Sequence, residues 1–266
     1  DYETSFYPNF MVSQVDFSFL NASYQPFTGG AVYYNPGLNM MFKVGANDLF
    51  EDYRIIGGMR LATDFDSNEF LFSFENLKKR LDRQMLLHRQ VFKTSTEFSL
   101  LKTISHEAFY ILKYPLNQVT ALKITAVFRH DRTVFLSTDT QNLNEKDIYS
   151  PWLGLKGEYI FDNTRFLGVN LYSGLRYKIF AEAYKNIISR KSDLIVVGAD
   201  FRHYTRVHRT LIWANRFAAS SSFGNTPLVY YLGSVDNWTN FSPRVEIFDR
   251  SVPIDYSRNY AYQTLA

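Results

Sequence analysis

The side chains best suited to acid–base chemistry or metal binding are five histidines, and their spacing supports neither. They are His88, His106, His130, His203 and His208. Zinc ligands that share one helix face are about four residues apart, whereas His203 and His208 fit neither one helix face nor one strand face. The triplets Phe128-Arg129-His130 and Phe201-Arg202-His203 repeat one pattern. We expect both at strand ends, with a metal site as the alternative, and His88 at an interior or interfacial position.

No other catalytic or nucleotide-binding motif is present. The chain has no cysteine, which excludes thiolate nucleophiles, disulfides and cysteine-ligated metals. It contains no GxSxG, no GxxxxGK[ST] and no GxGxxG after a strand. Asp64, Asp66 and Glu69 lack the spacing of a calcium loop and are expected to form a turn. Glu51 and Asp52 fall in a predicted connection, and the sequence offers no base that could act together with these two carboxylates. We therefore expect no catalytic residue, no cofactor, no metal site and no enzymatic activity.

Composition narrows the class of protein. The 266 residues are 46% hydrophobic and 17% aromatic, which is too apolar for a disordered chain. The net charge of +3 comes from scattered basic residues, so nucleic acid is not an expected partner. No stretch approaches the roughly 18 apolar residues that a membrane helix needs. Residues 1–4 do not resemble a signal peptide, so an exported protein would be a processed chain or a piece of a longer one.

Alternation of apolar and polar residues with period two runs along the whole chain. It is clear at 11–20, 53–63, 69–76, 121–130, 155–161, 176–183 and 195–202, and weaker at 38–45, 83–92, 106–114 and 209–219. This pattern is typical of strands that face two different environments. It predicts about eleven strands of about eight to eleven residues, the length that crosses a bilayer at a tilt.

The predicted connections alternate between long and short, which is typical of a transmembrane β-barrel. Long ones cover 21–37, 93–105, 138–152 and the chain after about 220; short ones lie near 46–52, 77–82, 115–120 and 203–208; those at 64–68, 162–173 and 185–192 are intermediate.

Aromatic residues collect at predicted strand ends, as in interfacial girdles. They are Tyr33, Tyr34, Tyr114, Tyr149, Trp152, Tyr184, Tyr204, Tyr230 and Tyr231. A soluble sandwich or lipocalin-like barrel is the alternative, but its outer face would be richer in Lys and Glu.

A set of charged residues shares the polar face of these strands and would line one interior. They are Arg54, Arg60, Lys123, Arg129, Lys156, Glu158, Arg176, Lys178, Glu182, Asp200, Arg202 and Arg216. Charges of both signs in such a wall are expected to pair across strands and stiffen it. The alternative is a charged conduit or a docking surface for an inserted loop.

Several short segments carry a family resemblance. Asp162-Asn163-Thr164-Arg165, followed by Ser173-Gly174-Leu175-Arg176, resembles the bacterial surface antigen superfamily of BamA-type assembly barrels. Tyr230-Tyr231-Leu232-Gly233 resembles the segment that opens the sixth extracellular loop of these barrels, although Ser234 replaces a second glycine. The segments 25–29, 48–54, 111–115, 200–204, 212–217 and 235–238 resemble the C-terminal barrel of Bacteroidetes proteins that join a TolB-like propeller to such a barrel.

The resemblance implies an all-β fold of sixteen antiparallel strands that close a barrel in the bacterial cell outer membrane. The sixth loop of such a barrel folds into the lumen and carries an Arg-Gly-aromatic motif. We therefore expect residues 1–266 to form a single barrel domain that stops before this motif and the last strands, with 220–266 as the long sixth loop. The implied partners are outer-membrane lipid, a periplasmic propeller or accessory domain, and other subunits of an envelope complex.

The function implied by the resemblance is insertion or translocation of proteins, or of lipids, at the outer membrane. In BamA-type relatives the first and last strands form a seam that opens sideways, so the predicted strand 11–20 would carry it here. A structural barrel that anchors a propeller or surface partners is the alternative, and a passive pore is a third. Nothing in the residues names the cargo.

Overall fold

The structure is a computed structural model, and it describes the strands and the shorter connections of the chain. The described residues are 4–16, 33–34, 39–63, 66–95, 100–136, 145–168, 171–189, 193–209, 211–225, 230–234, 247–248, 252–253 and 263–265. No helix in this described part is long and apolar enough to cross a membrane.

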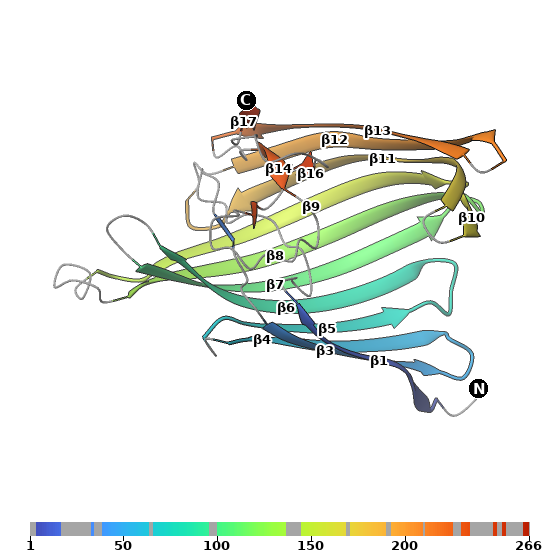
Figure 1. Ribbon diagram of the computed structural model, residues 1–266. Helices are drawn as coiled ribbons and strands as arrows, with labels where there is room; N and C mark the ends of the chain where they lie inside the picture. The colour runs from blue at the N-terminus through green and yellow to red at the C-terminus, as the bar shows by residue number, and fades with distance from the viewer. Residues whose placement is uncertain are drawn as a thin grey trace.

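One antiparallel sheet of 12 strands dominates the molecule and curves into an open trough (Figure 1). In spatial order its strands are β1 (Phe6–Asp16), β3 (Asn39–Asp48), β4 (Tyr53–Ala62), β5 (Asn68–Asn76), β6 (Asp82–Ser95), β7 (Leu100–Pro115), β8 (Thr120–Leu136), β9 (Ile148–Asp162), β11 (Leu171–Asn186), β12 (Asp193–His208) and β13 (Leu211–Gly224), while β10 (Arg165–Gly168) pairs with β11. Every predicted strand corresponds to one of these. The longest, β8, has 17 residues, which exceeds the expected length.

Neighbours in the sequence are neighbours in the sheet, so the connections fall alternately at the two ends. The turn end holds 49–52, 77–81, 116–119 and 209, as well as 163–164 between β9 and β10. The opposite end of the sheet is here called the loop end. Several predicted connections extend into strands, among them 138–152, where β9 begins at Ile148, and 162–173, which contains β10. Residues 93–105 are not a long loop, because β6 continues to Ser95 and β7 begins at Leu100; 203–208 is not a turn, because β12 continues to His208. Alternation was weak at these sites, so the prediction ended the strands too early.

The two faces of the sheet differ as the alternation predicts. Side chains on the concave face converge, and most of the buried residues lie there; the fully buried ones include Arg60 and Glu69. The convex face carries large exposed apolar side chains, such as Met11, which is 72% exposed, and Phe217, which is 71% exposed. Polar groups inside and apolar groups outside are the reverse of the arrangement in a water-soluble β-protein. This contrast excludes the soluble sandwich as a description of these faces.

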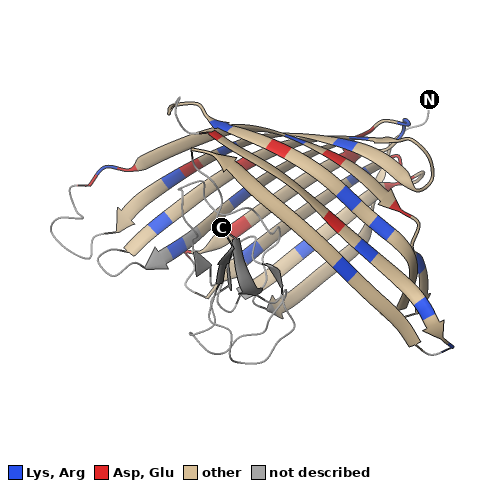
Figure 2. Cartoon of the chain, turned by 90° about the horizontal axis from the view of Figure 1, so that it is seen from above, with Lys and Arg blue, Asp and Glu red and all other residues tan. Residues whose placement is uncertain are grey.

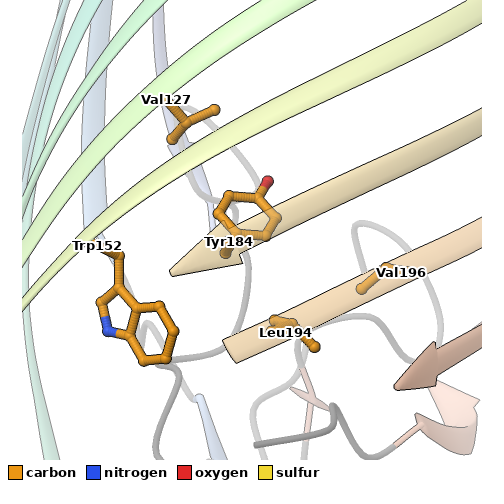
Figure 3. Packing of buried hydrophobic residues seen from close by; sticks show 5 residues of the cluster. All are labelled: Val127, Trp152, Tyr184, Leu194 and Val196. Atoms are coloured by element: carbon orange, nitrogen blue, oxygen red, sulfur yellow. The ribbon is translucent and has the colours of Figure 1, made fainter. Parts of the chain in front are cut away.

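The expected aromatic girdle is only partly correct. Tyr114 and Tyr149 lie exposed on the convex face. Trp152 and Tyr184 instead point to the concave side, where they pack with Val127, Leu194 and Val196 in a buried cluster (Figure 3). Period-two spacing places an aromatic residue at a strand end but does not say which face it occupies, because a shift of one residue reverses the face.

β1 lies at one edge of the sheet and pairs only with β3 among the described strands. Its register shifts between Pro8 and Phe10. A β-carbon on Gly45 would lie 2.2 Å from the Phe10 ring, so the ring lies directly over this glycine. Proline and a bulge are typical of edge strands, where fewer backbone bonds are needed.

Short strands follow β13. β14 (Tyr230–Ser234) pairs with β16 (Val252–Pro253) and β17 (Gln263–Leu265), and β15 (Ile247–Phe248) pairs with β2 (Tyr33–Tyr34). The predicted loop 220–266 begins too early, because β13 continues to Gly224. Most of its remaining residues lie outside the described part of the chain.

Candidate functional site

The candidate site is the charged concave face of the sheet. The register places all the predicted interior charges on this face: Arg54, Arg60, Lys123, Arg129, Lys156, Glu158, Arg176, Lys178, Glu182, Asp200, Arg202 and Arg216. Acidic and basic positions lie close together on neighbouring strands (Figure 2). The predicted pairing across strands is confirmed at most of them, as in the Arg54–Glu75 and Lys123–Glu158 pairs, at 3.6 and 3.1 Å.

A buried chain of ionic contacts, here called the histidine network, joins β4 to β8. Its members are Arg60, Glu69, His88, Glu107, Arg129 and Asp131. Arg60 Nε donates to Glu69 Oε2 over 2.9 Å, and the other oxygen of Glu69 lies 2.7 Å from His88 Nε2. His88 Nδ1 lies 2.8 Å from Glu107 Oε2. The imidazole therefore bridges two carboxylates with its two nitrogens.

The network continues on the far side of Glu107. Arg129 Nη1 lies 3.4 Å from Glu107 Oε1, and Arg129 Nε donates to Asp131 over 2.9 Å. Ser105 Oγ donates to Asp131 Oδ1 over 2.6 Å. If both glutamates are ionised, both ring nitrogens of His88 must donate, which requires the imidazolium. Three cations then face three carboxylates, so the buried network is neutral overall.

Sequence reasoning found only part of this network. His88 lies inside the trough, as predicted, but Glu69 is on β5 and not in a turn. Glu107 and Asp131 were missed altogether, because their partners lie on adjacent strands and only the register brings them together. The repeated Phe-Arg-His triplets also lie inside β8 and β12 instead of at strand ends.

A second group, the lysine cluster, lies nearer the turn end on β8, β9 and β11. It consists of Lys123, Lys156, Lys178, Glu158 and Glu182. Lys156 Nζ lies 3.4 Å from Glu158 and 3.9 Å from Glu182. The Lys156 and Lys178 ammonium groups also lie 5.1 and 5.7 Å from the centre of the Phe180 ring. These cation–π contacts explain why an aromatic residue interrupts the polar face.

Asp200 joins the lysine cluster to the edge of the sheet. Its carboxylate accepts from Arg202 Nη2 over 3.0 Å and from Arg216 Nη2 over 2.9 Å. A cavity of about 240 Å³ opens between these groups and the lysine cluster, lined on its other side by Asp162 and Arg176. Among the described residues, its lining holds four cations (Lys123, Lys178, Arg176 and Arg202) and three carboxylates (Glu158, Asp162 and Asp200). The cavity is therefore lined by charges of both signs.

Two of the segments that carry the family resemblance, 162–165 and 173–176, meet at the turn end. Asp162 Oδ1 accepts from the Thr164 backbone and hydroxyl, over 3.0 and 2.6 Å. Asn163 Oδ1 accepts from the Leu175 backbone over 2.7 Å, and Gly174 has a φ of +118°. A β-carbon on Gly174 would lie 2.9 Å from the Asn163 carbonyl oxygen, so both the close approach and the backbone conformation call for glycine here.

Comparison with known proteins gives a structural likeness and no sequence match. No family model and no curated protein matches the chain. The crystal structure of BamA from Haemophilus ducreyi lacking POTRA domains 1–3 is similar, with a TM-score of 0.55 and 15% identity over 74% of this chain. The likeness covers 41% of that BamA chain, so this chain spans less than half of its length. At this identity the comparison shows the fold alone: the chain is an all-β protein with the strand arrangement of a BamA barrel.

Proposed function

We propose that this chain is part of a bacterial outer-membrane β-barrel that inserts or translocates proteins at the outer membrane. The observation that carries the proposal is the place of β1 as the edge strand of the described sheet, which has the BamA strand arrangement. An exposed strand edge offers unpaired backbone groups to an incoming strand, which can then add to the sheet. Lipid is the alternative cargo.

The convex face supports a place in the membrane. Its exposed side chains at mid-strand are almost all apolar, among them Leu122, Ile124, Leu155 and Ile179. Burying apolar surface in lipid yields roughly 25 cal/mol per Å², and antiparallel strands satisfy their backbone groups within the sheet. The concave face, with its paired charges, suits a polar lumen.

The strands near β1 are better suited to opening than the rest of the wall. β1, β3, β4 and β5 have 11, 10, 10 and 9 residues, whereas β7, β8 and β9 have 16, 17 and 15. Each residue pair adds backbone bonds and side-chain contacts, so shorter strands separate at a lower cost. The shorter strands therefore lie at the β1 edge of the described sheet.

The partners are proposed from the sequence resemblance to Bacteroidetes propeller–barrel fusions and other surface antigens. A periplasmic propeller or accessory domain would lie at the turn end of the sheet, because the short connections of such barrels face the periplasm. Outer-membrane lipid would surround the convex face. Other subunits of an envelope complex would bind at the loop end.

Site-specific photo-crosslinking in cells tests the proposal. A photoreactive residue at Ser13 of β1 is expected to capture newly made outer-membrane proteins. The matched control is Ile179 of β11, which also lies on the convex face but in a fully paired strand. Equal capture at both positions, or none at Ser13, would contradict the proposal and leave the anchoring role for the barrel.

A further inference from the structure

The convex face carries a groove that the proposed function does not use. The groove has a volume of about 770 Å³ and extends over β3 to β8. Its floor is a row of directly opposite residues on successive strands: Val44, Gly57, Phe72, Leu87, Ala108 and Phe128. Gly57 and Ala108 are the small members of this row. A β-carbon on Gly57 would meet no atom within 4 Å, so open space lies above it.

The next row toward the loop end changes from apolar to basic along its length. It consists of Phe42, Met59, Phe70, Arg89, His106 and His130, again directly opposite one another. Arg89 Nη1 donates to Asn68 Oδ1 over 2.5 Å, and its guanidinium lies 5.9 Å from the centre of the Phe70 ring. The groove therefore has an apolar half on β3 to β5 and a polar end at β6 and β7, where Arg89 is the cation.

No carboxylate pairs with Arg89 within the described residues. The nearby acidic groups at the loop end are already engaged by other cations. Asp66 pairs with Lys93 and Lys102, at 2.6 and 3.5 Å, and Asp147 pairs with Arg132 at 2.6 Å. An arginine on the lipid face of a barrel destabilises the folded state in the bilayer, and an anion beside it would offset this cost.

We propose that this groove binds one anionic lipid, with its phosphate at Arg89 and an acyl chain along the apolar row. Charge complementarity selects the headgroup, because a guanidinium binds a phosphate through two parallel hydrogen bonds. His106, directly opposite Arg89, supplies a further donor beside the same site. The gap above Gly57 and Ala108 admits a chain that larger side chains would exclude. The proposal concerns lipid alone and does not depend on whether the barrel handles proteins.

Native mass spectrometry of the delipidated full-length protein in detergent tests this site. Phosphatidylglycerol is expected to bind at one saturable site, and phosphatidylcholine more weakly. Arg89→Gln is expected to lower the affinity for phosphatidylglycerol about tenfold, the effect of losing a charged hydrogen-bond donor. Arg83→Gln is the matched control, because Arg83 is exposed on the same face of β6 at the opposite end of the strand.

A second pair of variants tests the apolar half. Gly57→Leu is expected to fill the groove and abolish saturable binding. Gly157→Leu is its control, because Gly157 on β9 also has open space above it but lies outside the groove. Resistance of the folded barrel to detergent at room temperature shows that each variant folds.

Any of four results would overturn the proposal. The first three are equal affinity for both lipids, equal losses in Arg89→Gln and Arg83→Gln, and equal losses in Gly57→Leu and Gly157→Leu. Displacement of phosphatidylglycerol by millimolar inorganic phosphate would also overturn it, because the site would then recognise phosphate without the acyl chain.

Discussion

His88 and Glu69 lie on adjacent strands but are not directly opposite, and their side chains meet diagonally, with 2.7 Å between His88 Nε2 and Glu69 Oε1. The residue directly opposite His88 on β5 is Leu71. The diagonal contact lets the imidazole reach Glu107 on β7 as well, over 2.8 Å. One side chain thereby ties three strands together in the middle of the wall.

Removal of this imidazole is expected to destabilise the sheet strongly. His88→Leu leaves two buried carboxylates without the cation between them, and breaking a buried ion pair costs about 3–5 kcal/mol. His106→Leu is the control, because His106 lies on the neighbouring strand but faces outward. Urea unfolding in lipid vesicles measures both free energies. Equal stability of His88→Leu and the parent protein would show that the network is not a structural tie.

Crowding at Gly154 is expected to displace the buried tyrosine. A β-carbon there would lie 2.2 Å from Tyr184 Cδ1, and overpacking typically costs about 1–3 kcal/mol. Gly154→Ala should therefore lower the free energy of unfolding, and the fluorescence of the neighbouring Trp152 should change. Gly157→Ala, three residues further along β9 in open space, should leave both unchanged. Similar effects of the two variants would contradict the packing of this cluster.

Asp66, in the connection before β5, provides a pH-dependent contact. The hydrogen bond from Lys93 holds the pKa of its carboxyl below the ordinary value of 3.8, and the charge of Lys102 adds to this effect. Because the folded-state pKa is lowered, the contact stabilises the fold above the unfolded-state pKa and is lost as the pH falls through the folded-state pKa. A carboxyl NMR titration should show the low pKa. Lys93→Met should raise it, and Lys78→Met, at the turn end of the sheet, should not.

Substitution of Gly174 is expected to disrupt the turn end. Gly174→Ala would force a side chain into a φ of +118° and against the Asn163 carbonyl oxygen. We expect a loss of about 1–3 kcal/mol in the free energy of unfolding, measured by urea titration. Gly168→Ala, where a β-carbon meets only Leu171 at 3.5 Å, serves as the control. An unchanged midpoint for Gly174→Ala would show that this glycine is not required.

Period-two alternation was sufficient to predict the strands and the face of each interior charge, because the side chains of a strand alternate strictly between its two faces. It failed where both faces become similar, as at the start of β7 near Leu100, and there the strand was predicted too short. The histidine network could not be predicted. Glu69, His88 and Glu107 are each separated by 19 residues in the sequence, and only the register of three strands makes them neighbours.

A covalent link between β1 and the final strand of the full-length protein is the most direct test of the proposed function. The chain has no native cysteine, so Ser13→Cys can be paired with one cysteine in the final strand of the full-length protein. The control pair is Ser13→Cys with Phe42→Cys, which are directly opposite on β1 and β3 and leave the edge open. We predict that oxidation of the first pair alone blocks insertion of outer-membrane proteins, and that reduction restores it. Full activity of the locked barrel would contradict the account and assign the barrel an anchoring role.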